Sequence, residues 1–131
     1  MEKPFKTPHY VMLIDDDGIT NLIHQSLISR YDPHIELQAY NDARHALNTL
    51  VDQQKNDPAS LPELILLDIN MPGMNAWEFL EAYQAEGLSC YLMILTSSID
   101  KRDRDKAAQY PAVRGFIVKP LSRTDLDALL R

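Results

Sequence analysis

Residues 64–68 have the sequence LILLD, four apolar residues followed by a single acid. Three further apolar runs are similarly short: YVMLI at 10–14, YLMIL at 91–95 and GFIV at 115–118. Their β-branched residues and polar flanks favour strands buried on both faces over pieces of buried helix. A fifth run, IELQAY at 35–40, alternates apolar and polar side chains, which indicates an edge strand with one face in water.

Between these runs, the spacing of the apolar residues changes to that of amphipathic helices. The spacing predicts helices with these buried faces: Ile19, Leu22, Ile23, Ser26 and Leu27; Ala43, Ala46, Leu47, Leu50 and Val51; Ala76, Phe79, Leu80 and Tyr83; and Leu126, Leu129 and Leu130. Residues 99–110 form a weaker helix, whose thin apolar stripe would let it pack loosely and shift. The alternation predicts an α/β fold, a flavodoxin-like doubly wound (βα)5 sandwich with a five-stranded parallel sheet in the order 2-1-3-4-5.

Length and charge narrow the function classes. The 131 residues fit one domain, 1–131, in which 1–8 are a short N-terminal extension and no output domain is expected. A net charge of −6 argues against a broad contact with a phosphate backbone, so we expect no nucleic-acid partner. No apolar run approaches the roughly 20 residues of a membrane helix, and the first residues lack a signal-peptide pattern. We therefore expect a cytoplasmic protein without a membrane partner.

Chemically useful side chains follow four of the five predicted strands. They are Asp15, Asp16 and Asp17 after the first strand, Asp68 after the third, Thr96 after the fourth and Lys119 after the fifth. These four strands are neighbours in the predicted order, so their carboxyl ends bring the side chains to one edge of the sheet.

Carboxylates packed this closely repel one another, and an all-oxygen cluster suits Mg²⁺. The cation would neutralise charge on an incoming phosphoryl group, while Lys119 and Thr96 hold its oxygens and Asp68 attacks. The predicted reaction is phosphoryl transfer to an aspartate.

The segments LIDDD, LLDINMPGMNAWEFL, ILTSS and FIVKPLS occur in the order and at spacings similar to those of response-regulator receiver domains of two-component signalling. The resemblance spans nearly the whole chain and is to stand-alone receivers of the chemotaxis type. It implies a phosphoprotein in a phosphorelay, whose aspartate is phosphorylated by a histidine kinase, a histidine phosphotransfer protein or a small phosphodonor. Apart from catalysing its own aspartyl phosphorylation and dephosphorylation, it would not be an enzyme. Its output would be contact with a downstream protein target, made as a monomer or a weak phosphorylation-linked dimer.

The resemblance also implies a role for each residue of the site. Asp16 and Asp68 would bind Mg²⁺ directly, Asp15 would bind it through water, and Asn70 would bind it through its backbone carbonyl. Thr96, Lys119 and the backbone N–H of Ser97 would bind the phosphoryl oxygens. Thr96 and Phe116 would be the switch residues, and the peptide bond before Pro120 would be cis. The chain departs from the family at Asn75-Ala76, where many receivers carry Asp-Gly. Because alanine tolerates positive φ poorly, a different loop geometry is expected there.

Several simpler or rival interpretations remain open. Asp15 and Asp16 could instead cap the following helix, and Asp17 is expected to be a cap or a nearby charge, not a ligand. A haloacid-dehalogenase-type phosphatase also combines Asp, Mg²⁺, Thr and Lys, but it requires Asp-x-Asp where this chain has Asp68-Ile69-Asn70. A receiver-like interaction module that is never phosphorylated is the other alternative. The four histidines are not spaced as metal ligands, and we expect all of them to face solvent. They are His9, His24, His34 and His45.

Overall fold

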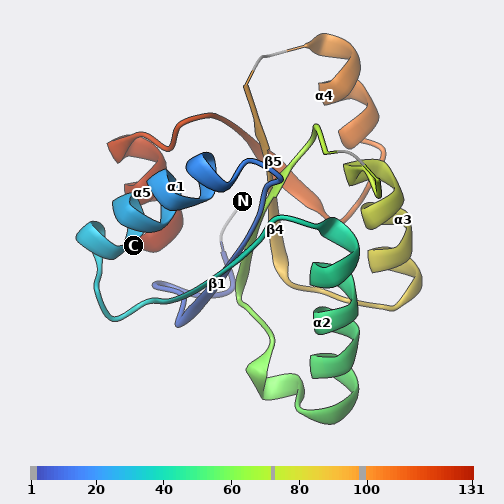
Figure 1. Cartoon of the computed structure of the whole chain (residues 1–131), viewed down its shortest axis with the longest axis horizontal. Coiled ribbons are helices and arrows are strands. Elements are labelled where there is room, and N and C mark those ends of the chain that lie inside the picture. Colours follow the sequence, from blue (N-terminus) through green and yellow to red (C-terminus); the bar gives the residue numbers. More distant parts are fainter. Residues whose placement is uncertain (1–2, 72, 98–99) are drawn as a thin grey trace.

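The computed structural model describes residues 3–71, 73–97 and 100–131, in which strands and helices alternate (Figure 1). The strands are β1 (Tyr10–Ile14), β2 (Glu36–Tyr40), β3 (Leu64–Asp68), β4 (Tyr91–Thr96) and β5 (Val113–Val118). The helices are α1 (Gly18–Tyr31), α2 (Ala43–Asn56), α3 (Ala76–Ala85), α4 (Lys101–Ala107) and α5 (Arg123–Leu130), with a short 3₁₀ helix, η1 (Pro58–Ser60). Within the described residues, no helix combines the length and the apolar composition that a membrane-spanning segment needs.

The five strands form one parallel sheet in the order β2-β1-β3-β4-β5, which confirms the predicted flavodoxin-like fold. Three of the apolar runs lie in the inner strands β1, β3 and β4, and the alternating run forms the edge strand β2. The run at 115–118 lies in β5, which is the other edge strand, and only Ile117 of this strand is buried, so the prediction that this run is buried on both faces is wrong. The register keeps neighbouring strand ends level, since Asp68 pairs with Leu95 and Thr96 pairs with Val118. Residues that follow these strands therefore emerge at the same edge of the sheet.

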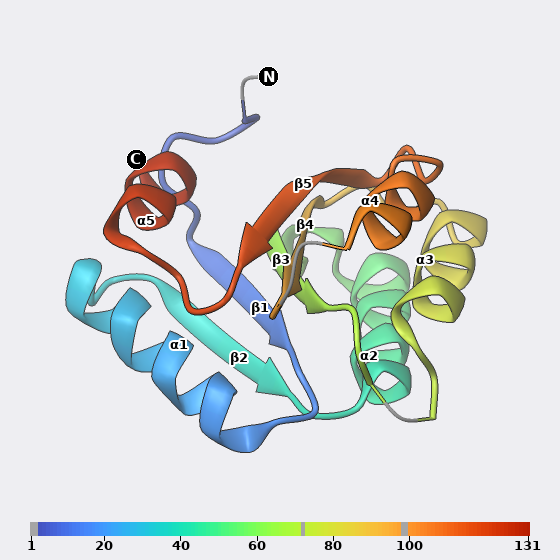
Figure 2. The same cartoon turned by 90° about the horizontal axis from the view of Figure 1, so that it is seen from above.

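Helices cover both faces of the sheet, α1 and α5 on one face and α2, α3 and α4 on the other (Figure 2). Successive strand residues point to opposite faces, so each strand feeds two cores. Met12, Ile14, Ile65 and Leu67 pack with α2 and α3, whereas Val11, Leu13, Leu64 and Leu66 pack on the other face. The buried faces predicted for α3 and α5 are confirmed in full, and that of α2 is confirmed except for a half-buried Val51.

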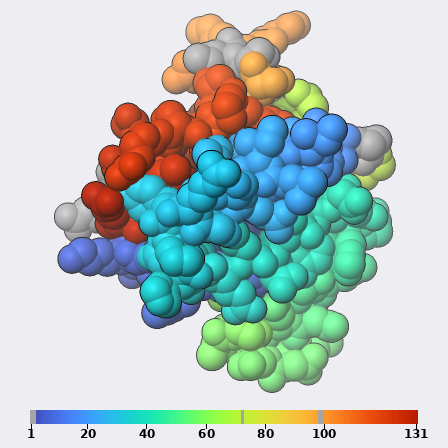
Figure 3. All heavy atoms as spheres, turned by 60° about the vertical axis from the view of Figure 1, so that its left-hand side comes forward, coloured from blue at the N-terminus to red at the C-terminus, as the bar shows by residue number. Residues whose placement is uncertain are grey.

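The prediction for α1 is wrong. Four of the five residues assigned to its buried face are exposed: Ile19 by 70%, Leu22 by 66%, Ile23 by 47%, and Ser26. The helix instead buries Asn21, His24 and Ile28, so the expectation that every histidine faces solvent is wrong for His24. Figure 3 shows α1 as a blue-to-cyan surface at the front of the molecule, beside the red α5.

Hydrogen bonds to the backbone explain the orientation of α1. Asn21 Nδ2 donates to the carbonyl of Asp15 at 2.9 Å, and His24 Nε2 accepts from the N–H of Leu121 at 3.4 Å. Buried backbone groups need such partners, and the face of α1 that carries Asn21 and His24 supplies them. The polar contacts therefore decide which side of the helix faces the sheet.

Two other local expectations are refined by the structure. The thin stripe predicted for residues 99–110 is confirmed in α4, which is only seven residues long and buries Ala107; residue 99 lies outside the described residues. The departure at Asn75-Ala76 is accommodated because Asn75 caps α3, in a capping box with Glu78, and Ala76 is the first helical residue. Among the described residues, glycines alone adopt positive φ, and in this loop Gly73 does so.

The N-terminal extension lies against the end of α5. Lys3 Nζ donates to the carbonyls of Leu129 at 3.1 Å and Arg131 at 2.7 Å, and Thr7 Oγ1 donates to that of Leu130 at 2.9 Å. The last carbonyls of a helix lack partners within the helix, so these donors supply what α5 needs.

Candidate functional site

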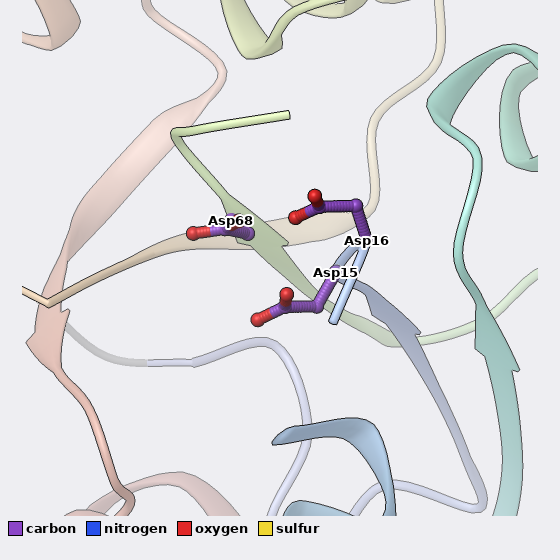
Figure 4. Close-up of side chains that lie close together, drawn as sticks. All are labelled: Asp15, Asp16 and Asp68. Carbon is purple, nitrogen blue, oxygen red and sulfur yellow. The ribbon is translucent and has the colours of Figure 1, made fainter. Parts of the chain in front are cut away.

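The carboxyl ends of four strands carry the residues predicted to form the site. Asp15 and Asp16 follow β1, Asp68 and Thr96 end β3 and β4, and Lys119 follows β5. Asp15, Asp68 and Thr96 are buried, whereas Asp16 is exposed. Figure 4 shows the side chains of Asp15, Asp16 and Asp68 lying close together at the ends of β1 and β3. The fold thus brings together acids that are far apart in the sequence.

The three acids have the spacing and chemistry of a divalent-cation site. Asp15, Asp16 and Asp68 each offer one oxygen, and these oxygens all lie within 4.8 Å of one another. Ligands on opposite sides of a Mg²⁺ ion are about 4 Å apart, so a small movement would close the oxygens on such an ion. Two buried acids and one exposed acid also suit a cation that keeps several of its waters. These residues therefore fit Mg²⁺.

Lys119 lies between the two buried acids. Its Nζ is 2.9 Å from Asp15 Oδ2 and 3.0 Å from Asp68 Oδ1. Burial by itself lowers the pKa of Lys119, but the hydrogen bonds to Asp15 and Asp68 outweigh burial and raise this pKa above its ordinary value. Lys119 is therefore a fixed positive charge beside the carboxylate of Asp68.

The carboxylate of Asp68 is poorly solvated. Burial raises its pKa above the ordinary value, and the nearby charge of Asp15 adds to the increase, while the hydrogen bond from Lys119 opposes it. One ammonium group cannot balance three carboxylates, so a further cation would stabilise the ionised form of Asp68.

The consecutive acids Asp15, Asp16 and Asp17 have different roles. Asp17 is the N-cap of α1, because its carboxylate accepts from the N–H groups of Ile19 at 3.0 Å and Thr20 at 3.5 Å. Asp15 is engaged on both oxygens, by the N–H of Asp17 at 3.0 Å and by Lys119. The capping alternative for Asp15 and Asp16 therefore fails, and the expectation that Asp17 is a cap is confirmed.

The remaining predicted residues surround this cluster or lie beside it. A hollow of about 550 Å³ is lined by Asp15, Asp16, Asp17, Thr20, Ile23, His24, Asp68, Asn70, Ser97, Lys119 and Pro120. Asn70 and Ser97 are exposed at its rim, and the Lys119–Pro120 peptide bond is cis, as the resemblance implied. Phe116 does not line the hollow; it is half-buried in β5, with the guanidinium carbon of Arg104 in α4 5.9 Å from its ring centre.

Sequence reasoning missed two polar residues of this region, Asn21 and His24. Asn21 joins the end of β1 to that of β2, because its Nδ2 also donates to the carbonyl of Tyr40 at 3.4 Å. With Ile28, the two residues have the three- and four-residue spacing of one helix face. This spacing is the signal in the sequence that could have identified the buried face. It does not appear in a pattern of apolar residues, because two of its three members are polar.

Comparisons with known proteins identify the family. The model of the response regulator receiver domain matches residues 11–131. The chain is 29% identical over 119 residues to the nitrate/nitrite response regulator protein NarL of Escherichia coli (strain K12), a match that covers 91% of this chain and 51% of NarL. It is 23% identical over 122 residues to the transcriptional regulatory protein PcoR of Escherichia coli, covering 92% and 49%. The chain thus spans about half the length of these relatives.

Solved structures agree with this match. A two-component response regulator from Cytophaga hutchinsonii has a TM-score of 0.81 and 31% identity, and the match covers 92% of each chain. A response regulator receiver protein from Dyadobacter fermentans, at 24% identity, has a TM-score of 0.76 with 90% and 91% covered, which supports the fold alone. The family match, the site at the strand ends and the shared fold together establish that this chain belongs to the response regulator receiver domain family.

Proposed function

We propose that Asp68 accepts a phosphoryl group from a histidine kinase or a histidine phosphotransfer protein in a Mg²⁺-dependent reaction. Receiver domains are signalling modules that interact with such proteins and typically bind Mg²⁺. The observation that carries the proposal is the buried carboxylate of Asp68, 3.0 Å from the ammonium of Lys119 and clustered with Asp15 and Asp16. The family match over residues 11–131 favours this function over the haloacid-dehalogenase-type phosphatase.

In the proposed reaction, a carboxylate oxygen of Asp68 attacks the phosphorus of a phosphohistidine. The new O–P bond makes an acyl phosphate, and the P–N bond breaks as the donor histidine leaves with the electron pair and takes up a proton. A bound Mg²⁺ would neutralise charge on the transferring phosphoryl group. Asp16 and Asp68 would hold this ion directly, Asp15 through water and Asn70 through its backbone carbonyl.

The remaining site residues would stabilise the phosphoryl group. Lys119 already carries its charge beside Asp68, so its ammonium would bind a phosphoryl oxygen without a large rearrangement. The hydroxyl of Thr96 and the backbone N–H of Ser97 would bind the other oxygens. Electrostatic positioning of this kind, more than covalent chemistry by the protein, accounts for catalysis of phosphoryl transfer.

The exposed apolar residues of α1 support a protein as the phosphoryl donor. Ile19, Leu22 and Ile23 form an outward face, and Ile23 also lines the hollow above Asp68. Adjacent exposed aliphatic side chains are typical of contact surfaces. We therefore place the docking face of the donor on α1, where it would present its phosphohistidine to the hollow.

The output would be a change in a protein-contact surface around α4 and β5. Thr96 would move toward the phosphoryl group and Phe116 would turn inward to fill the space. Phe116 now borders a hollow of about 500 Å³ with Lys101, Arg104, Asp105 and Ala108, so its movement would reshape this surface. The short α4 gives that surface a weakly anchored element.

The protein would be a stand-alone cytoplasmic receiver, either a monomer or a weak dimer when phosphorylated. Its catalysis would be limited to its own aspartate, and it would bind neither nucleic acid nor membrane. The negative charge of the chain, −6, supports the part concerning nucleic acid. Detection of the native protein in its source by immunoblotting would test the stand-alone part, since a band well above the mass of this chain would contradict it.

The mass of the intact protein after incubation with acetyl phosphate, with and without Mg²⁺, tests the central claim. We expect one Mg²⁺-dependent phosphoryl adduct in the wild type and in the control Asp52→Asn, an exposed acid of α2, and none in Asp68→Asn. Absence of the adduct in wild type, with a known receiver as positive control, would favour an interaction module that works without phosphorylation. An adduct that persists in Asp68→Asn would place the acceptor elsewhere.

A further inference from the structure

His24 is a buried imidazole that the proposed phosphoryl transfer does not use. It is 1% exposed, and it lines the same hollow as Asp15, Lys119 and Pro120. Its Nε2 accepts from the N–H of Leu121 at 3.4 Å, whereas its Nδ1 has no hydrogen-bond partner among the described residues. A buried polar ring with one nitrogen unpaired is unfavourable where an aliphatic side chain would fit. Apolar packing alone therefore does not explain a histidine at this position.

The partner of His24 belongs to the loop that carries the active-site lysine. Leu121 is two residues after Lys119, on the far side of the cis peptide bond. At the start of this loop, the N–H of Lys119 donates to the carbonyl of Thr96 at 2.8 Å. The loop is thus held at one end by β4 and at the other by α1, with the ammonium of Lys119 between Asp15 and Asp68.

We infer that His24 is a positioning residue, whose Nε2 ties α1 to the loop at Leu121 and thereby keeps Lys119 directed at Asp68. The neutral ring with its proton on Nδ1 is the form that accepts at Nε2. Burial lowers the pKa of His24, and the positive charge of Lys119 acts in the same direction, while Asp15 opposes them. The neutral form is therefore favoured at this position.

This link also connects two surfaces of the molecule. The outer side of α1 carries Ile19, Leu22 and Ile23, and its inner side carries His24. The imidazole therefore lies between the proposed docking face on α1 and the loop that carries Lys119. For its effect on rate, the inference rests on the proposed phosphorylation of Asp68.

The variants His24→Leu and His24→Gln separate positioning from packing. Leucine fills the site without an acceptor, whereas the Oε1 of glutamine reaches about as far from the backbone as Nε2 does and still accepts a hydrogen bond. His34→Gln is the control, because His34 is exposed in the turn before β2. Each variant would be examined for amide hydrogen exchange at Leu121, for the rate of Asp68 phosphorylation by acetyl phosphate with Mg²⁺, and for stability in urea.

We expect His24→Leu to unfold at nearly the same urea concentration as wild type, because the added apolar contact offsets the unpaired N–H of Leu121. It should nevertheless exchange the Leu121 amide faster and be phosphorylated about fivefold more slowly, the effect of losing one ordinary hydrogen bond. His24→Gln should keep both properties near those of wild type. Unchanged exchange and an unchanged rate in His24→Leu would overturn the inference, and so would a failure of glutamine to rescue. If the wild type itself gave no adduct, the proposed function would fail, while exchange at Leu121 would still decide whether His24 holds the loop.

Discussion

The ammonium of Lys119 lies 3.0 Å from Oδ1 of Asp68, so the carboxylate proposed as phosphoryl acceptor is already paired with a fixed cation. The same ammonium is 2.9 Å from Asp15 Oδ2. The lysine thus stands where it neutralises the acids of the site and where it would later meet the phosphoryl group. Because the ammonium already neutralises part of the charge of Asp15 and Asp68, it should compete with Mg²⁺ for these carboxylates.

Lys119→Met should bind Mg²⁺ more tightly than the wild type. Removing the ammonium leaves Asp15 and Asp68 without their shared cation, and the unbalanced negative charge then favours a divalent ion. We expect Kd to fall by about tenfold, equivalent to about 1.4 kcal/mol, in isothermal titration calorimetry. Lys101→Met, which removes an exposed lysine paired with Asp105, should leave Kd unchanged. An equal or weaker affinity in Lys119→Met would show that the lysine does not compete with the metal.

Asp68→Asn should stabilise the Mg²⁺-free protein at neutral pH. Burial raises the pKa of Asp68 in the folded state above the ordinary value of 3.8. The protonated side chain therefore stabilises the folded state at low pH, and this stabilisation is lost as the pH rises through the folded pKa. Asparagine stays neutral and avoids this loss. We expect a gain on the order of 1 kcal/mol at pH 7 that shrinks as the pH falls toward 3.8.

Urea denaturation across this pH range, in the presence of a chelator, measures the effect of Asp68→Asn. Asp52→Asn, which changes an exposed acid of α2, should show no comparable dependence on pH. Addition of Mg²⁺ should reverse the order by stabilising the wild type more than Asp68→Asn. A constant difference between the two proteins at all pH values would contradict the raised pKa.

Lys3→Ala should loosen the end of α5. Lys3 Nζ donates to the carbonyls of Leu129 and Arg131, where a positive charge also interacts favourably with the helix dipole. We expect a loss of about 0.5 kcal/mol in the free energy of unfolding and faster amide exchange in the last turn of α5. Lys6→Ala is the matched control, since the side chain of Lys6 is exposed and its carbonyl still accepts from Lys3. Equal exchange in the two variants would mean that the extension does not hold the helix.

The sequence was sufficient to predict the sheet and the acidic cluster because both depend on one simple pattern. Short apolar runs form four of the five strands, and a parallel sheet places whatever follows them at one edge, so the pattern alone brings Asp15, Asp68 and Lys119 together. The extent of α2 was harder to predict. Residues 52–56 continue the helix beyond Val51, the last residue of its predicted apolar face, because a polar helical turn carries no apolar signal.

The orientation of α1 could not be predicted from apolar periodicity for a different reason. Its inner face is chosen by single hydrogen bonds, from Asn21 to the carbonyl of Asp15 and from the N–H of Leu121 to His24. The partners of these side chains are backbone groups that come close only in the folded chain. Ile19, Leu22 and Ile23 are consequently left outside, where they are available to a partner.

Leu22→Ser should slow phosphorylation by a protein donor without affecting phosphorylation by acetyl phosphate. Leu22 is 66% exposed at the centre of the apolar face of α1, so its loss removes contact area for a docking protein and leaves Asp68 and its neighbours unchanged. We expect transfer from a phosphorylated histidine phosphotransfer protein to slow by about tenfold, corresponding to about 1.4 kcal/mol of lost contact. The free energy of unfolding should change by less than about 0.5 kcal/mol, as is usual for an exposed position.

The control for this surface is Ala85→Ser, an exposed position on α3 at the opposite face of the sheet, which should leave both rates unchanged. Rates of phosphotransfer and of acetyl phosphate labelling would be measured in parallel on the same preparations. If Leu22→Ser slowed both reactions equally, the helix would be acting on the site itself and not as a docking face. If it slowed neither, the donor would dock elsewhere and the exposed residues of α1 would serve another contact.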